Sequence, residues 1–373
     1  MAEASSEAML KRVFSFAAGS CPLPLQVKEQ VARDVIDWGG RGLSALEIPF
    51  TSAEFEAVLT AAKDDLRLLL GIPRSYEVLF LQGGATAQFG MLPLNLRGPA
   101  CHCEYVESGY WSRRAIAEAQ GICGGSNGTR GVRVIATGTA TRPPSPGTWR
   151  HGPGAAYCHF TSNESANGLQ FRDFPNGGEA PLVVDMTGDF LTRPVPVNRF
   201  GLIYASAQKS LGATGLTIVI VRADLLDRAR ADIPVPFNYA LQTAAGSKVN
   251  TPPAFAIMIA TRMLRWLVES GGLQFASMQG RERSAKLYAA IDASGFYRAP
   301  IACDARSAVN VCFHLPNERL EEAFAHKAET QGLLHLRGHP CVGGLRASIF
   351  NATPDEAIEA LLDFMGEFRA RNV

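Results

Sequence analysis

One lysine stands in a run of small, uncharged residues between two apolar segments. Lys209 occurs within residues 205–215, whose sequence is ASAQKSLGATG. A lysine with so little charge around it is a candidate for a lowered pKa and for an imine with a carbonyl compound. On composition alone, a solvated lysine in a turn fits the same stretch.

Two further groups that precede this lysine could bind a ligand. Residues 82–88, with the sequence QGGATAQ, follow an apolar strand and precede a helical pattern, so their N–H groups could hold a phosphate. A tight turn without a ligand would need the same glycines. Asp185 ends another apolar strand, where α/β folds place ligand-binding groups, although it could equally cap a following helix.

The three groups together match the needs of one cofactor. Pyridoxal 5′-phosphate requires a phosphate cradle, a carboxylate for the pyridine nitrogen and a lysine for covalent attachment. The turn at residues 82–88, Asp185 and Lys209 supply these groups in that order along the chain.

The elements that must position these groups alternate between strands and helices. Continuous apolar runs predict buried strands at 77–81, 181–185, 201–205 and 217–221. A helix is expected from about Pro252 to the Gly271-Gly272 pair. The remaining chain has its own alternation, with helices expected at 283–293, 318–331 and 355–370 and strands at 308–313 and 345–350. We therefore expect an α/β protein with a mainly parallel sheet and a second, smaller α/β domain.

Composition excludes several other classes of protein. The chain has 373 residues, 47% of them hydrophobic, and 36 Lys and Arg against 35 Asp and Glu. Its near-zero net charge gives no footprint for nucleic acid, and no apolar run approaches membrane-spanning length. The N-terminal residues do not resemble a secretory signal, and eight scattered cysteines suggest free thiols, so a cytoplasmic location is expected. The Cys101-His102-Cys103 spacing is too tight for the usual zinc site, and no metal is predicted.

From Phe14 to about Phe368 the sequence resembles the phosphoserine aminotransferase family, a branch of the class V, fold-type I pyridoxal-phosphate enzymes. The resemblance rests on short motifs in the family's order: Leu81-Gln82-Gly83-Gly84-Ala85, Gly109-Tyr110-Trp111-Ser112, Thr161-Ser162-Asn163-Glu164, Val184-Asp185-Met186, Ala207-Gln208-Lys209, Val249-Asn250-Thr251-Pro252-Pro253, Gly338-His339 and Gly343-Gly344-Leu345-Arg346-Ala347-Ser348-Ile349.

The resemblance implies an architecture and an assembly. Residues 25–268 would form a large cofactor domain, and residues 1–24 with 269–373 a small one. The active site would lie between them in a homodimer with shared sites. The implied activity is a ping-pong aminotransferase that exchanges an α-amino group between an amino acid and a 2-oxo acid.

The resemblance also assigns roles to individual residues. Lys209 would bind the cofactor and carry the substrate proton, Asp185 would pair with the pyridine nitrogen, and Trp111 would stack on the ring. Arg346 would grip the substrate α-carboxylate. The other cofactor contacts implied are Ala85, Thr86, Ser165 and Gln208, with Asn250 and Thr251 from the partner subunit.

The motif that binds the distal anion of the substrate departs from the family pattern. The family has a His-Arg pair where this chain has Phe50 and Thr51, and a Gly-His-Arg triplet where this chain has His339 followed by Pro340. Each lost charge-assisted hydrogen bond to a phosphate is worth about 1.5–3 kcal/mol. We therefore expect specificity for a less polar or smaller side chain than that of phosphoserine or glutamate.

Two alternatives remain open from the sequence. Arg41, Arg337 or Lys248 could restore the anion site, and the enzyme would then be a phosphoserine:2-oxoglutarate aminotransferase. The same cofactor could also support elimination, replacement or decarboxylation, because the pocket decides which bond breaks.

Overall fold

A seven-stranded sheet organises most of the chain in the computed structural model, which describes residues 13–98, 102–124 and 131–372. The strand order is β2-β10-β9-β8-β5-β3-β4, and every neighbouring pair is parallel except those made by β10. The strands are β2 (Tyr76–Gln82), β3 (His102–Glu107), β4 (Gly131–Thr137), β5 (Ala155–Thr161), β8 (Leu182–Asp185), β9 (Phe200–Ser206) and β10 (Leu216–Arg222). The mainly parallel α/β sheet predicted from the apolar runs is confirmed.

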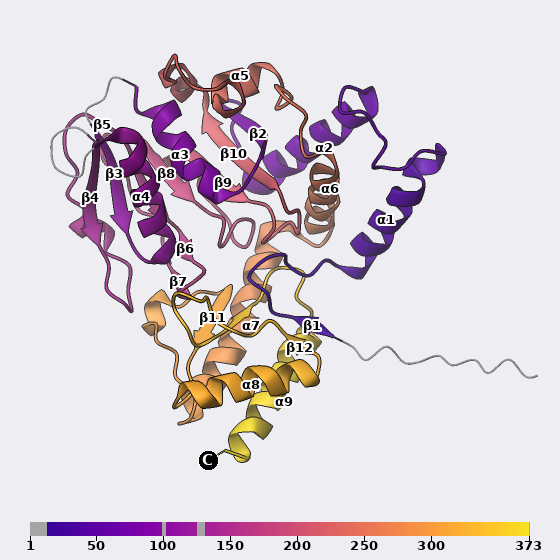
Figure 1. The fold of residues 1–373 in the computed structure, drawn as a ribbon, viewed down its shortest axis with the longest axis vertical. Coiled ribbons are helices and arrows are strands. Elements are labelled where there is room, and N and C mark those ends of the chain that lie inside the picture. Colours follow the sequence, from indigo (N-terminus) through magenta and orange to yellow (C-terminus); the bar gives the residue numbers. More distant parts are fainter. Residues whose placement is uncertain (1–12, 99–101, 125–130, 373) are drawn as a thin grey trace, which may run out of the picture.

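Helices cover both faces of this sheet, which explains why its strands are apolar throughout (Figure 1). One face packs against α2 (Ala53–Leu70) and α6 (Ala254–Glu269), with α1 (Leu25–Ile36) beside α6. The other face packs against α3 (Ala85–Leu96) and α4 (Tyr110–Cys123). The remaining short elements are α5 (Tyr239–Ala244), η1 (Trp38–Gly40), η2 (Pro146–Thr148), η3 (Val197–Arg199), η4 (Ala223–Arg228), η5 (Val235–Phe237) and η6 (Cys303–Ala305).

A second hydrophobic core lies below the sheet in Figure 1, where α8 and α9 are labelled. Phe324 is fully buried at its centre and makes edge-on ring contacts with Tyr297, Phe313, Phe364 and Phe368. The elements around it are β1 (Phe14–Ser15), α7 (Gly272–Ala293), β11 (Asn310–Phe313), α8 (Glu318–Thr330), β12 (Leu333–Leu334), β13 (Leu345–Ser348) and α9 (Asp355–Ala370). β1 pairs with β12, so the first described residues belong with the last hundred.

One predicted boundary is wrong. The helix expected at 283–293 begins eleven residues earlier, because α7 starts at Gly272, directly after the left-handed Gly271. Only Leu273 and Ala276 are buried within residues 272–282, too few to give the periodic apolar pattern that a sequence prediction depends on.

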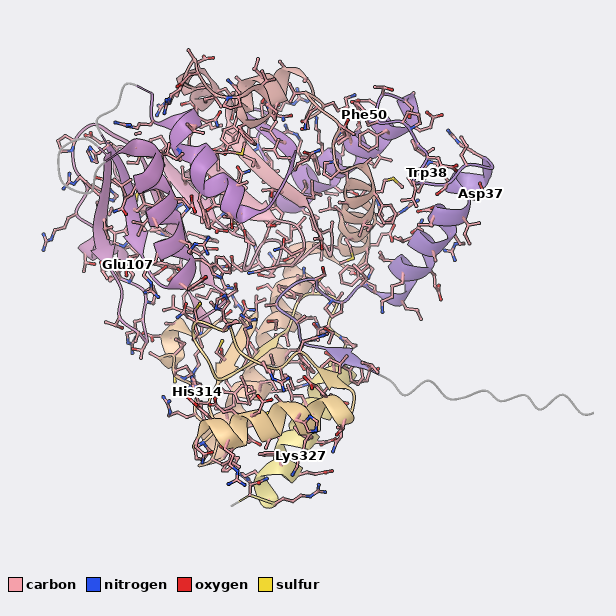
Figure 2. The ribbon with its side chains drawn as sticks, in the orientation of Figure 1. Asp37, Trp38, Phe50, Glu107, His314 and Lys327 are labelled. Carbon is pink, nitrogen blue, oxygen red and sulfur yellow. The ribbon has the colours of Figure 1, made fainter. Side chains whose placement is uncertain are left out.

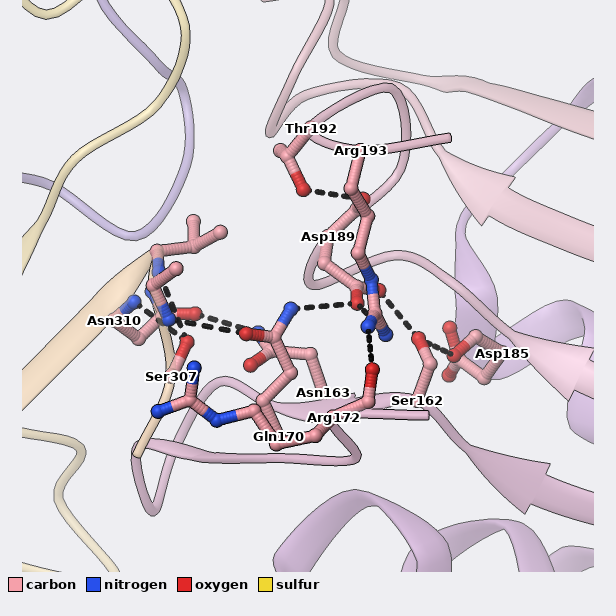
Figure 3. Close-up of polar contacts among 12 residues, drawn as sticks. Ser162, Asn163, Gln170, Arg172, Asp185, Asp189, Thr192, Arg193, Ser307 and Asn310 are labelled. Atoms are coloured by element: carbon pink, nitrogen blue, oxygen red, sulfur yellow. Dashed lines mark hydrogen bonds and ion pairs between the residues drawn. The ribbon is translucent and has the colours of Figure 1, made fainter. Parts of the chain in front are cut away.

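Buried polar side chains connect the sheet to the second core (Figure 3). The Asp189 carboxylate accepts hydrogen bonds from Ser162 and from Gln170 (2.8 Å), and pairs with Arg193 at 3.0 Å. The Asn163 amide donates to the Asn310 side chain across the junction. Asn163 lies in β6 (Asn163–Glu164), which forms a short hairpin with β7 (Leu169–Gln170). Among the described helices, none is long and apolar enough to cross a membrane.

Removing the Asp189 carboxylate should destabilise this junction strongly. Asp189→Ala leaves the Arg193 charge half-buried without its partner and removes the acceptor for Ser162 and Gln170, so we expect a loss of about 3–5 kcal/mol in unfolding free energy. Urea denaturation followed by circular dichroism measures this loss. Asp232→Ala is the control, because Asp232 pairs with Arg230 at the exposed surface and should leave stability nearly unchanged. Equal effects of the two substitutions would contradict the junction's importance.

Candidate active site

A cavity of about 140 Å³ opens at the carboxyl ends of β5, β8 and β9. Parallel strands end together at one edge of a sheet, so the residues that follow them converge there. The lining residues are Gly84, Ala85, Thr86, Trp111, Thr161, Asn163, Ser165, Asp185, Thr187, Gly188, Ser206, Gln208 and Lys209. The cavity therefore brings together all three groups that the sequence singled out: the glycine-rich turn, the strand-end aspartate and the lysine.

Lys209 is buried in this cavity with its amine among neutral groups. Its Nζ donates a hydrogen bond to Ser165 Oγ and lies 5.8 Å from the centre of the Trp111 ring. Burial lowers the pKa of Lys209 to about 8, against the opposing influence of Asp185, and the Arg346 charge lowers it further. The interpretation of Lys209 as a solvated turn lysine is therefore wrong.

Asp185 is buried at the end of β8 and keeps its carboxylate in the cavity. Burial raises the pKa of Asp185, while the hydrogen bonds from Thr187 and the Lys209 charge lower it. The backbone N–H of Thr187 donates to Asp185 Oδ1 at 2.8 Å. The segment that follows is a turn, so Asp185 caps no helix there. Behind it, Tyr204 hydrogen-bonds to Asp185 and to the buried His159 (2.9 Å).

A buried glutamate holds Trp111 in place. It belongs to one of the family motifs, but no role was predicted for it from the sequence. Glu164 accepts hydrogen bonds from the backbone N–H groups of Trp111 (2.7 Å) and Ser112 (2.9 Å), at the first turn of α4. A carboxylate in this position satisfies N–H groups that the helix itself leaves unpaired, and it suits the positive end of the helix dipole. The Trp111 indole N–H also donates to Ser165 at 3.1 Å.

The glycine-rich turn presents the start of helix α3 to the cavity. Gly84 precedes the helix, and no side chain caps its first N–H groups. A Cβ on Gly84 would lie 3.4 Å from Ser206 Oγ, an ordinary contact, so the turn passes directly beside the end of β9. Uncapped N–H groups at a helix start suit an anion.

Of the residues expected to bind the substrate, Arg346 reaches this cavity, whereas His339 and Pro340 line a neighbouring hollow. Arg346 donates to the Ser165 carbonyl at 3.0 Å, and burial lowers the pKa of Arg346. The His339 ring lies 4.4 Å from that of Tyr110 and 5.9 Å from that of Trp111. Burial and the charges of Arg346 and Lys209 lower the pKa of His339. Pro340 lines a neighbouring hollow with His339 rather than the main cavity.

Four predicted residues lie outside the cavity of the single chain. In Figure 2, Phe50 lies on the same side of the molecule as Trp38 and Asp37. Glu107, which ends the strand that leads to the cavity, lies on the opposite side of the view. Thr51 is exposed beside Phe50. Asn250 and Thr251 contact Gln82 at the end of β2 instead of the cavity. None of these four residues lines the cavity of its own chain.

Several lining residues were missed by the sequence, although most lie within quoted motifs. Thr161 and Asn163 line the cavity, and the Thr161 hydroxyl and the Asn163 carbonyl oxygen are buried without a hydrogen-bond partner in the described part of the chain. Their position at the end of β5, level with Asp185, was the available signal. Thr187, Gly188 and Ser206 follow or end neighbouring strands in the same way.

Comparison with known proteins gives a consistent result. The family described as aminotransferase class V matches residues 13–361. The phosphoserine aminotransferase of Azotobacter vinelandii is 47% identical over 363 residues, covering 96% of this chain and 99% of that protein. The corresponding solved structure from Bacillus circulans subsp. alkalophilus has a TM-score of 0.93 at 40% identity, covering 97% of this chain and 99% of its own. The pyridoxal-phosphate-bound phosphoserine aminotransferase of Trichomonas vaginalis has a TM-score of 0.91 at 33% identity, covering 95% and 100%.

These relatives imply pyridoxal 5′-phosphate as cofactor, and the cavity fits it. A buried amine with a lowered pKa suits covalent attachment, a buried carboxylate suits a pyridinium, and uncapped helix N–H groups suit a phosphate. The unpartnered oxygens of Thr161 and Asn163 leave polar groups for a ligand to satisfy.

The lowered pKa of Lys209 predicts how the cofactor-free protein captures pyridoxal phosphate. The neutral amine is the nucleophile, so the capture rate should rise with pH up to about 8 and then level off. Stopped-flow absorbance between pH 6.5 and 9.5 measures this profile. A rate that keeps rising toward the pKa of an ordinary lysine, about 10.4, would contradict the burial argument. Lys209→Arg, which retains the charge, should show no capture.

Proposed function

The chain belongs to the class-V aminotransferase family, in its phosphoserine aminotransferase branch, and we propose that it uses an amino acid with a neutral or smaller side chain than phosphoserine. It is a pyridoxal-phosphate-dependent aminotransferase acting on small amino and 2-oxo acids. The proposal concerns the identity of its two substrates. The amino group would pass between them by a ping-pong mechanism.

The cavity residues divide the work of the reaction. The bound cofactor supplies the electron sink. We assign to Lys209 the attachment of the cofactor and the transfer of the proton at the substrate Cα, for which a pKa of about 8 suits both directions. Asp185 would pair with the pyridine nitrogen of the cofactor and favour its protonated form, and Trp111 would pack against the cofactor and exclude water. Ser165 would donate a hydrogen bond to the cofactor's phenolic oxygen.

The remaining assignments concern the two ends of the bound ligands. Ala85, Thr86 and Gln208 hold the phosphate, with the start of α3 behind them. Arg346 binds the substrate α-carboxylate as a bidentate donor, and it already lies against Ser165.

We also propose a homodimer with shared active sites. Phe50, Thr51, Asn250 and Thr251 do not line the cavity of their own chain, yet they stand where the family's partner-supplied residues stand. Exposed apolar side chains on the same flank as Phe50, including Leu43 and Leu46, support an interface there.

The ion pairs of three cations carry the proposal on specificity. Arg41, Arg337 and Lys248 are the groups that could replace the missing anion clamp. Arg41 pairs with Glu54 at 2.6 Å, and Lys248 pairs with Glu56. Arg337 binds both Glu322 (2.6 Å) and Glu329. Each cation is already matched by a carboxylate, so none offers an uncompensated charge to a substrate phosphate.

A second candidate function is phosphoserine transamination itself. The names of the curated relatives favour it, because those at 42–47% identity are phosphoserine aminotransferases. In that case His339, whose ring lies near that of Trp111 in the neighbouring hollow, would have to bind the phosphate together with a cation that leaves its present carboxylate partner.

The visible absorbance of the purified holoenzyme distinguishes the two candidates. Conversion of the cofactor to its amino form bleaches the band, so each amino acid can be tested singly without a coupling enzyme. We expect no change with phosphoserine or glutamate and bleaching with a neutral amino acid. Bleaching by phosphoserine and glutamate at micromolar concentrations would contradict the altered specificity.

Restoring the clamp should create phosphoserine activity. The triple variant Phe50→His, Thr51→Arg and Pro340→Arg should raise kcat/KM for phosphoserine about tenfold or more, equal to recovering one charge-assisted bond of about 1.5 kcal/mol. Steady-state kinetics with a fixed 2-oxo acid measure this gain. Met278→Arg adds an exposed charge on α7 as the control and should leave kcat/KM unchanged. A triple variant no better than the control would refute the assignment of the clamp.

A further inference from the structure

Three side chains with metal-binding atoms meet within the sheet, away from the cofactor cavity, and a fourth, His102, lies beside one of them. His102 and Glu104 lie two residues apart on β3, so they share one face of the strand. Cys158 on β5 is the register partner of Glu104, and His151 lies in the loop before β5. One ligand atom each from Glu104, His151 and Cys158 lies within 4.8 Å of the others. None of the four residues lines the cavity around Lys209.

The His102 ring lies next to this cluster and is a candidate for a fourth ligand. Its Nε2 lies 3.5 Å from Glu104 Oε1, and the residue is only 4% exposed. This nitrogen has no hydrogen-bond partner in the described part of the chain. A buried ring nitrogen without a partner is costly, and its position beside a carboxylate oxygen suits a shared cation.

The charge of Glu104 supports the same conclusion. Its side chain is fully buried and accepts hydrogen bonds from His151 Nδ1 at 2.7 Å and from the Gly152 N–H at 2.6 Å. Among the described residues, no lysine or arginine forms an ion pair with Glu104. The Arg133 guanidinium packs against Gly152 nearby, at the more exposed side. A buried carboxylate needs a compensating positive charge, which a divalent ion supplies.

We propose that His102, Glu104, His151 and Cys158 bind a divalent metal ion of the zinc type. Two imidazole nitrogens, one carboxylate oxygen and one thiolate form a donor set typical of tetrahedral zinc. On binding, the ion replaces the proton of the Cys158 thiol, which is released to solvent. The Nδ1 lone pair of His151 then faces the ion instead of Glu104.

This site differs from the Cys101-His102-Cys103 spacing that was considered for zinc from the sequence. Of the Cys101-His102-Cys103 run, Cys101 lies outside the described residues, and Cys103 packs on the opposite face of β3 with Tyr105. His102 alone takes part, with partners 49 and 56 positions away in His151 and Cys158, counted from their residue numbers. The proposal therefore departs from the expectation that the chain binds no metal.

The ion would be structural. It would join β3, β5 and the loop at residues 142–154 near the end of the sheet opposite the cavity. Its loss should therefore reduce stability and leave the cofactor band intact. Without an ion, the hydrogen bonds from His151 and Gly152 to Glu104 would still hold the loop, and Cys158 would be an inert buried thiol.

Zinc titration of the chelator-treated holoenzyme tests the proposal. We expect a single tightly bound zinc ion by mass spectrometry and a higher thermal midpoint on adding zinc chloride. X-ray absorption of the zinc-loaded holoenzyme should show one sulfur at about 2.3 Å and nitrogen or oxygen at about 2.0–2.1 Å. Failure to bind zinc, or a bound ion without a sulfur ligand, would overturn the site.

Matched variants separate this site from adventitious binding. Cys158→Ala and His151→Ala should each weaken zinc binding at least tenfold, and His151 is half exposed in its loop, so its loss should not prevent folding. Cys103→Ala removes a thiol that is equally buried in the same sheet, and it should bind zinc as the wild type does. Equal zinc affinity in all three variants would refute the proposal.

Discussion

The burial of one amine opposite one carboxylate constrains the whole cavity. Lys209 and Asp185 lie in the same water-poor space, where the desolvation that lowers the pKa of the lysine raises that of the aspartate. The buried pair is tolerable because each charge partly offsets the other. A sheet with parallel strands provides this arrangement, since β8 ends at Asp185 and the turn after β9 returns Lys209 to the same edge.

The surrounding polar groups keep this space in shape. Glu164 fixes the start of α4 and therefore Trp111, while Thr187 and Tyr204 orient Asp185. Asp189, in the turn after β8, accepts a hydrogen bond from Gln170, and the side-chain oxygen of Gln170 accepts one from the Ala308 N–H just before β11 of the second core. Arg346 reaches the cavity from that second core, so the position of the substrate carboxylate depends on the junction. Cofactor binding and substrate binding thus rely on different cores held together by buried hydrogen bonds.

Local patterns in the sequence predict the elements better than the contacts between them. The strands around Asp185 and Lys209 are continuous apolar runs, and α9 begins and ends as its periodicity predicts. The start of α7 was missed because only Leu273 and Ala276 are buried within residues 272–282, too few to give a periodic apolar pattern. Glu164 acts through a hydrogen bond to Trp111, which lies 53 positions earlier in the chain, so no local pattern reveals its role. Long-range pairings of this kind also hide the cluster around Glu104 from a sequence reading.

The covalent attachment of the cofactor to Lys209 is the claim on which the account rests, and it can be measured directly. Borohydride reduction of the holoenzyme fixes the cofactor to its lysine, and peptide mass spectrometry then locates the added group. The account predicts that the pyridoxyl group is found on Lys209 and that Lys209→Ala carries none. Label on another lysine, or a holoenzyme that yields no labelled peptide, would contradict it.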